Sequence, residues 1–355
     1  MSISFIIPVY NAEFYIVSCV ESIINLCLPD FEIIIVDDGS KDNTVCEIEK
    51  ALFKWNCTLH RVKLIKQENA GVSAARNHAL KYCTKEWVTF VDADDLILPS
   101  FKDACNIIIN YTGDVDVFIF DLFSSSNRDF STFRVDNISQ KVEVFDENNR
   151  VLLMQNTIGF VSNKNKLSYR FPNSLAKIYN LKRIIDKYDI RFPVGVKNGE
   201  DLLFNLQVME KVNKVVACHI PVYLYYSNTN SLTHRFKSDI KEITLKFFDN
   251  LWPFVERHQE LIPQYHKSKV NNFYLEAGHF LFHPQNKMKT IERWDYFQEM
   301  LKGYYHESFL YLYSYPFHNK FNFWVFTLIK MRLYKVAFAF YMMKYFLKCM
   351  ICRAK

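Results

Sequence analysis

Four residues near position 92 bring several carboxyl groups into one short loop. Asp92-Ala93-Asp94-Asp95 directly follows a strand pattern, Val88-Thr89-Phe90-Val91. Carboxylate oxygens suit a hard divalent cation, and Mg²⁺ typically takes one or two protein carboxylates together with phosphate oxygens of a substrate. The loop therefore predicts a Mg²⁺ or Mn²⁺ site in which the metal joins the protein to a phosphorylated ligand. A turn whose aspartates cap the next helix is the structural alternative.

Three earlier segments carry groups that can hold a nucleoside diphosphate, namely residues 8–11, 36–44 and 68–77. Tyr10 at the end of a strand can stack on a base, Asp38 can read a base or ribose edge, and Arg76 can reach a diphosphate. Taken singly, Asp38 and the glycine after it form an ordinary turn, and an arginine on a helix is usually solvated. Together with the carboxylate loop, the three segments predict a nucleotide-diphosphate site.

Alternating strand and helix patterns must bring these groups together. The strands are predicted at residues 4–9, 32–36, 62–66, 87–91 and 115–120, and helices at 13–26, 43–54 and 72–82 lie between them. This alternation is typical of an α/β fold with a mostly parallel, Rossmann-like sheet and helices on both faces. Ligands of such sheets bind beyond the carboxyl ends of the strands, which is where the chemical groups above fall.

The pattern changes after residue 121. Residues 121–172 are polar around a predicted helix at 146–156, and further strands are predicted at 175–179, 215–219 and 222–226. Beyond residue 236 only helical patterns appear, at 237–258, 265–282 and 290–302. We therefore predict a first domain at residues 1–235 and a helical C-terminal region at residues 236–355.

The order and spacing of these motifs resemble those of the family 2 inverting glycosyltransferases, which have the GT-A fold. The resemblance covers residues 3–120 and, to a lesser degree, 172–235. It implies a nucleotide-sugar donor, with a UDP-sugar expected, and a divalent metal.

The resemblance also implies roles for individual residues. Tyr10 and Asp38 would contact the nucleobase, and Arg76 would lie near the diphosphate. Asp94 would bind the metal, and Asp92 would contact the ribose or a metal-bound water. The other residues implied at the donor are Pro8, Asn69 and Ala93.

Glu200-Asp201 follows Gly199 at the start of an apolar-periodic helix. The pair is similar to the Glu-Asp pair in which the family keeps its general base. Inversion needs a base that takes the proton of the acceptor hydroxyl while the nucleoside diphosphate leaves on the opposite side. We predict Asp201 as this base and Glu200 as its supporting partner. A simple helix cap is the alternative interpretation.

Two further positions follow from the resemblance. Lys177 and His234 fall where related transferases place residues near the diphosphate or the acceptor. His234 is a candidate third metal ligand, although a hydrogen-bonded structural histidine is the more common role.

Composition indicates the cellular setting. The chain has 355 residues and nine cysteines, an odd number without the paired spacing of a zinc site, which favours a reducing compartment. We found no signal peptide and no apolar run long enough to span a bilayer. These observations predict a cytoplasmic protein.

The C-terminal tail, residues 320–355, interleaves large aromatic residues with lysine and arginine. Glu307 is the last acidic residue of the chain. Basic residues among aromatics suit the headgroup region of an anionic membrane, which predicts peripheral attachment at the inner face of the cell membrane. However, the charges do not fall on one clean helical face, so a structural helix or a homo-oligomer interface is the alternative. Nucleic acid is an unfavoured partner, because no recognised binding module accompanies the tail.

The function predicted from the sequence is inverting transfer of one sugar from a UDP-hexose or UDP-N-acetylhexosamine. The acceptor would be a hydroxyl of a lipid-linked saccharide or an oligosaccharide in capsule, O-antigen or exopolysaccharide synthesis. Two alternatives are a nucleotidyltransferase and a catalytically silent nucleotide-sugar-binding protein. The Glu200-Asp201 pair argues against nucleotidyl transfer, and the intact acidic motifs argue against a silent protein.

Overall fold

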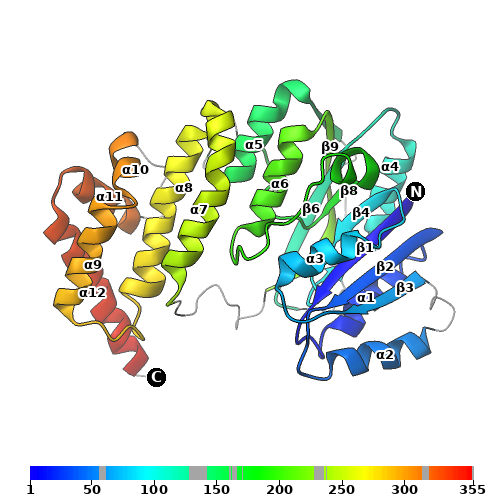
Figure 1. The fold of residues 1–355 in the computed structure, drawn as a ribbon, viewed down its shortest axis with the longest axis horizontal. Helices are drawn as coiled ribbons and strands as arrows, with labels where there is room; N and C mark the ends of the chain where they lie inside the picture. The colour runs from blue at the N-terminus through cyan, green and yellow to red at the C-terminus, as the bar shows by residue number, and fades with distance from the viewer. Residues whose placement is uncertain are drawn as a thin grey trace. The chain divides into compact units, whose positions relative to one another are not determined.

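The computed structural model describes residues 1–55, 61–127, 142–159, 161, 166–169, 171–227, 236, 238–313 and 320–353. The chain divides into two compact units (Figure 1). Unit 1 comprises Met1–Thr157 and Leu167–Thr229, and unit 2 comprises Ile158–Lys166 and Asn230–Lys355.

Unit 1 is built on a sheet whose first half is parallel. Its strands are β1 (Ser2–Val9), β2 (Asp30–Asp37), β3 (Val62–Lys66) and β4 (Trp87–Phe90), in the spatial order β3-β2-β1-β4. All three pairings among them are parallel. The predicted α/β class with a mostly parallel sheet is therefore confirmed, and the carboxyl ends of β1, β2 and β4 lie at one edge.

The second half of the sheet is mixed. β8 (Lys177–Asn180) lies antiparallel between β4 and β6 (Val117–Ser125), and β6 pairs in parallel with β9 (Lys214–Tyr226). The short strands β5 (Leu96–Ile97) and β7 (Val142–Asp146) are both antiparallel to β9.

The prediction of two separate strands at 215–219 and 222–226 was wrong, because β9 is continuous. The apparent break falls at Pro221, which has no N–H to donate to a ladder. A shift of register opposite Asp121 absorbs this missing donor, so the strand continues through the proline.

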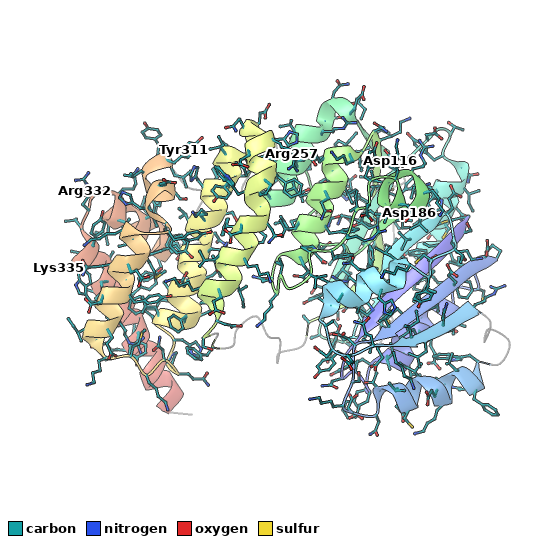
Figure 2. The ribbon with its side chains drawn as sticks, in the orientation of Figure 1. Asp116, Asp186, Arg257, Tyr311, Arg332 and Lys335 are labelled. Carbon is teal, nitrogen blue, oxygen red and sulfur yellow. The ribbon has the colours of Figure 1, made fainter. Side chains whose placement is uncertain are left out.

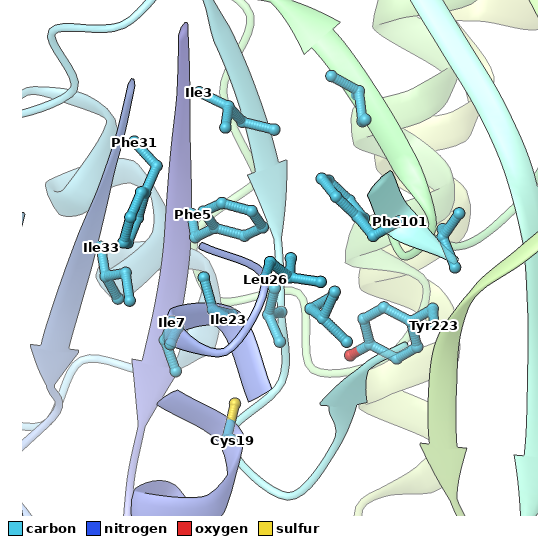
Figure 3. Close-up of a cluster of buried hydrophobic side chains, with 14 of the residues drawn as sticks. Ile3, Phe5, Ile7, Cys19, Ile23, Leu26, Phe31, Ile33, Phe101 and Tyr223 are labelled. Atoms are coloured by element: carbon cyan, nitrogen blue, oxygen red, sulfur yellow. The ribbon is translucent and has the colours of Figure 1, made fainter. Parts of the chain in front are cut away.

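Helices cover the sheet because their apolar residues recur at helical spacing. In α1 (Ile16–Ile24), for example, Ile16, Cys19, Val20 and Ile23 are buried. These side chains meet Phe5 and Ile7 of β1 in the main core (Figure 3). The other helices of unit 1 are α2 (Thr44–Lys54), α3 (Val72–Leu80), α4 (Phe101–Asn110), α5 (Arg150–Ile158) and α6 (Glu200–Lys211), with shorter turns at Glu147–Asn149 and Leu181–Asp186.

The regular secondary structure of the described part of unit 2 is helical, as predicted for the C-terminal region. Its helices are α7 (Ile240–Arg257), α8 (Ile262–Glu276), α9 (Thr290–Lys302), α10 (His306–Tyr311), α11 (Lys320–Lys330) and α12 (Tyr334–Arg353), with shorter turns at Gln259–Leu261 and Ala277–Leu281. A separate core that includes Phe273, Phe297 and Phe338 joins α8, α9 and α12. Among the described residues, no helix is long and apolar enough to cross a membrane.

Candidate active site

The loops after β1 and β2 are tied together by hydrogen bonds. The backbone N–H of Asn11 donates to Ser40 Oγ at 2.9 Å, and the N–H of Lys41 donates to Asn11 Oδ1 at 2.8 Å. Pro8 is buried in β1, whereas Tyr10 at the start of the loop is 46% exposed. The tied loops therefore hold the Tyr10 ring at the carboxyl edge of the sheet, where a planar ligand can reach it.

Asp38 organises the segment that leads into α3. Its carboxylate accepts hydrogen bonds from Gln67 Nε2 and from the N–H groups of Ala70 and Gly71, each at 2.8 Å. Asn69 Nδ2 donates to the Asp38 carbonyl oxygen at 2.9 Å. Gly71, at φ 89°, makes the turn into the helix that most other residues would strain. Asp38 thus holds the segment that carries Asn69, and its contact with a nucleobase stays a prediction.

The carboxylate loop separates its three aspartates by environment. Asp95 is 1% exposed, whereas Asp94 is exposed and Asp92 is half-buried. The Tyr223 hydroxyl accepts from the Asp92 N–H at 3.0 Å and donates to Asp95 Oδ2 at 2.7 Å. Burial, together with the charges of Asp92 and Asp94, raises the pKa of Asp95 to about 8. Asp95 therefore anchors the loop, and the roles of Asp92 and Asp94 toward a ligand stay predictions.

Tyr223→Phe should loosen this loop. The change removes one hydroxyl that serves two loop residues, so we expect a loss of about 1–3 kcal/mol in the free energy of unfolding. Urea titration would measure the loss. Tyr225→Phe is the matched control, because Tyr225 is its exposed neighbour on β9. Equal stability of the two variants would contradict the anchoring role of Tyr223.

Arg76 joins the carboxylate loop to α6. Its Nη2 lies 2.9 Å from Asp92 Oδ1, and its Nη1 lies 2.7 Å from Asp201 Oδ1. The side chain is 3% exposed, and its guanidinium lies 4.9 Å from the centre of the Phe192 ring. Burial lowers the pKa of Arg76, but Asp201, Asp92 and Glu200 outweigh it, so the pKa is raised and the charge is kept. The predicted base therefore lies beside the predicted donor loop.

Glu200 and Asp201 form the first turn of α6. Gly199 precedes them at φ 85°, a conformation that favours glycine. Asp201 Oδ2 also accepts from the Ser174 N–H at 3.1 Å, so both carboxylate oxygens have fixed directions. Burial and the adjacent Asp201 charge raise the pKa of Glu200. The two carboxyl groups are therefore placed differently, with Asp201 held by Arg76.

Lys177 lies at the start of β8, the strand that pairs directly with β4. It is 1% exposed, and its Nζ donates to the Asn173 carbonyl oxygen at 2.6 Å. Burial lowers the pKa of Lys177 to about 7, although the charge of Asp201 acts in the opposite direction. A titratable amine in the field of Asp201 is compatible with the predicted position near the diphosphate or the acceptor.

The donor set for a metal can be tested on the carboxylate loop. Within the described part of the chain, no group of three or more His, Cys, Asp or Glu side chains is arranged to hold a metal ion. Asp92 and Asp94, with the buried Ala93 between them, offer oxygen ligands from one loop. This donor set fits Mg²⁺ or Mn²⁺ with substrate phosphates completing the coordination shell. His234, the predicted third ligand, lies outside the described residues.

Sequence reasoning missed the residues that position the site. Tyr223, Phe192 and Ser174 contact the predicted residues through a hydroxyl, a ring face and a backbone N–H. None of the three belongs to a charged or glycine-rich motif, so their residue types gave no signal. Their contacts arise only where β9 and the segments before β8 and α6 meet the carboxyl edge of the sheet.

A family model and several known proteins are similar to this chain in sequence. The model of Glycosyl transferase family 2 matches residues 4–174. Glycosyltransferase GlyA of Streptococcus pneumoniae is 33% identical over 232 residues, which cover 65% of this chain and 31% of GlyA. Poly(ribitol-phosphate) beta-N-acetylglucosaminyltransferase TarS of Staphylococcus aureus is 28% identical over 228 residues, which cover 63% of this chain and 35% of TarS. Residues 4–174 therefore match a glycosyl transferase family 2 domain.

Solved structures show the same fold. Residues 1–349 of S. aureus TarS in complex with UDP-GlcNAc align with a TM-score of 0.51 at 22% identity, covering 78% of this chain and 81% of that one. Mannosyltransferase PcManGT of Pyrobaculum calidifontis, in complex with GDP-Man and Mn²⁺, aligns with a TM-score of 0.50 at 16% identity, covering 95% and 85%. The fold of unit 1 is the GT-A fold.

Proposed function

We propose that this protein transfers one sugar, with inversion, from a UDP-hexose or UDP-N-acetylhexosamine to an acceptor hydroxyl. The observation that carries the proposal is the double ion pair of Arg76. A single guanidinium contacts Asp92 of the donor loop at 2.9 Å and Asp201 of α6 at 2.7 Å. One guanidinium group therefore joins the candidate base to the loop expected to meet the donor. An in-line displacement requires the base and the donor to lie close together in this way.

In this reaction Asp201 accepts the proton of the acceptor hydroxyl. Arg76 and the Ser174 N–H orient its two oxygens. Glu200 lies on the same helical turn and is the supporting partner of Asp201. Asp92 and Asp94 would hold Mg²⁺ or Mn²⁺, which would neutralise charge on the leaving diphosphate. Tyr10 stacks on the nucleobase of the donor, and Asp38 holds the segment around Asn69 in place beside that nucleobase.

For the acceptor we propose a lipid-linked saccharide or an oligosaccharide of a bacterial surface polymer. The name of TarS, a poly(ribitol-phosphate) beta-N-acetylglucosaminyltransferase, supports a surface-polymer acceptor, and the TarS complex with UDP-GlcNAc supports a UDP-sugar donor. A lipid-linked acceptor would place the protein at the inner face of the cell membrane. Residues 1–235 would form the catalytic domain and residues 236–355 the helical region.

The donor assignment predicts that Tyr10→Ala weakens UDP binding. Base stacking on an aromatic side chain contributes about 1–3 kcal/mol per base, so we expect the dissociation constant to rise about 5- to 150-fold. Thermal shifts with UDP and Mn²⁺ would measure this, because ligand stabilisation scales with concentration over Kd. Phe14→Ala is the control, since Phe14 lies in the same loop region and is 82% exposed.

The same assay tests the donor class. UDP-sugars should stabilise the wild-type protein more than GDP-mannose does, and release of UDP should follow when an acceptor extract is added. A protein that binds UDP-sugars yet never releases UDP would be a silent binding protein. Equal weakening by the Tyr10 and Phe14 variants would contradict the stacking role.

A further inference from the structure

Helix α12 packs into unit 2 with one of its faces. Ala337, Phe338, Tyr341 and Met342 are buried in the core that also contains residues of α8 and α9. Their spacing of one, three and one residues places them on a single side of the helix. This side accounts for the attachment of α12 to its own unit.

The opposite side of α12 is also apolar, but it is exposed. Val336 is 42% exposed, Met343 59%, Phe346 56% and Leu347 55%. At about 100° per residue these four side chains fall within an arc of about 100°, roughly opposite the buried set. The turn before the helix continues the exposed surface with Met331 and Leu333. A helix that is apolar on its outer side as well needs a second partner.

Basic side chains flank this outward face. Lys335 and Lys344 are exposed and fall on its two sides, and Arg332 is exposed in the preceding turn. Lys344 Nζ lies 4.2 Å from the centre of the Phe321 ring of α11. Figure 2 shows Arg332 and Lys335 on the surface of the helical unit. No aspartate or glutamate follows Glu307 in the sequence.

This combination selects one class of partner. Two copies of the face would bring lysines together without any acidic residue of α11 or α12 to neutralise them. An anionic bilayer offers both an apolar layer and negative headgroups, at the depth reached by a helix that lies in the interface. The other side of α12 stays packed in its unit, and no described helix is able to span the bilayer.

We propose that the outward face of α12, comprising Met331, Leu333, Val336, Met343, Phe346 and Leu347 with Arg332, Lys335 and Lys344, docks the protein on an anionic lipid surface. The docking goes beyond sugar transfer and needs neither donor nor metal. It would hold the transferase where lipid-linked acceptors lie. Because vesicle binding is measured without substrates, it succeeds or fails independently of the proposed reaction.

The test compares two double variants of the full chain. Met343→Glu with Phe346→Glu alters the outward face, and Phe53→Glu with Ile109→Glu is the control. The control residues are exposed apolar side chains of α2 and α4, so both variants add the same charge. Co-sedimentation would use vesicles of phosphatidylglycerol with phosphatidylcholine, and vesicles of phosphatidylcholine alone. Melting temperatures would verify that both variants fold.

We expect the wild type and the control to bind the anionic vesicles and to bind phosphatidylcholine weakly. The α12 variant should lose about tenfold or more of this binding, since it loses apolar burial and gains repulsion. Salt at 1 M, which shortens the Debye length to about 3 Å, should weaken wild-type binding. Equal binding of the two variants, or a wild type that stays in the supernatant, would overturn the proposal. So would a wild-type dimer that only the α12 variant converts to a monomer.

Discussion

Asp201→Asn should lower kcat by about 10²–10⁴-fold while donor affinity is kept, because an amide cannot take the acceptor proton. Asparagine keeps the size of the side chain and an oxygen for the Ser174 N–H or Arg76. Initial rates of UDP release, with donor binding measured in parallel, would separate the chemical step from binding.

Glu200→Gln provides the comparison for Asp201→Asn. Glu200 lies on the same helical turn as Asp201, whereas the ion pairs of Arg76 are with Asp201 and Asp92. We expect a smaller loss of kcat in this variant. A larger loss would exchange the two roles, which the raised pKa of Glu200 makes chemically reasonable for a base. Full activity in both variants would move the base to another residue.

Asp94→Ala should abolish transfer and weaken metal-dependent donor binding. Asp94 is exposed at the tip of the carboxylate loop, whereas the buried Asp95 carries the anchoring contacts. The melting temperature without ligands should therefore change little, and EDTA should reduce wild-type activity to the level of the variant.

Asp114→Ala is the control for Asp94→Ala. Asp114 is 79% exposed, and its ion pair with Arg183 is at the surface, where such pairs contribute little to stability. Normal turnover by the Asp94 variant, or a wild-type rate that is insensitive to chelation, would show that the metal assignment is wrong.

The strand pattern of unit 1 could be predicted because parallel strands are apolar on both faces. The predicted strand at 62–66 has the same bounds as β3, and β1, β2 and β4 differ from prediction by no more than a few residues. The strand prediction was less complete for the mixed half of the sheet. β5 has only two residues, and both β5 and β7 pair with residues of β9 that are 68 to 128 positions away in the sequence. Local patterns carry no information on such partners.

The candidate site also has a part that sequence determines and a part that only the tertiary structure decides. The sequence by itself determined which loops carry chemistry, since the carboxyl ends of parallel strands share an edge wherever the strands form. Only the tertiary structure decided what each carboxylate does. Asp92, Asp94 and Asp95 are close in sequence, yet Asp95 is buried and accepts a hydrogen bond from the Tyr223 hydroxyl, whereas Asp94 is exposed and Asp92 pairs with Arg76. Arg76 and Asp201 are 125 residues apart, and their ion pair exists only once α3 and α6 meet.

The C-terminal tail shows what composition alone leaves undetermined. Composition determined that residues after Glu307 are basic and rich in aromatics. It did not determine which apolar side chains of α12 face inward, because both sides of the helix are apolar. The fold decided this by burying Ala337, Phe338, Tyr341 and Met342 and leaving Met343, Phe346 and Leu347 outside. The physical reason is that burial depends on what packs against a helix, and that partner lies elsewhere in the chain.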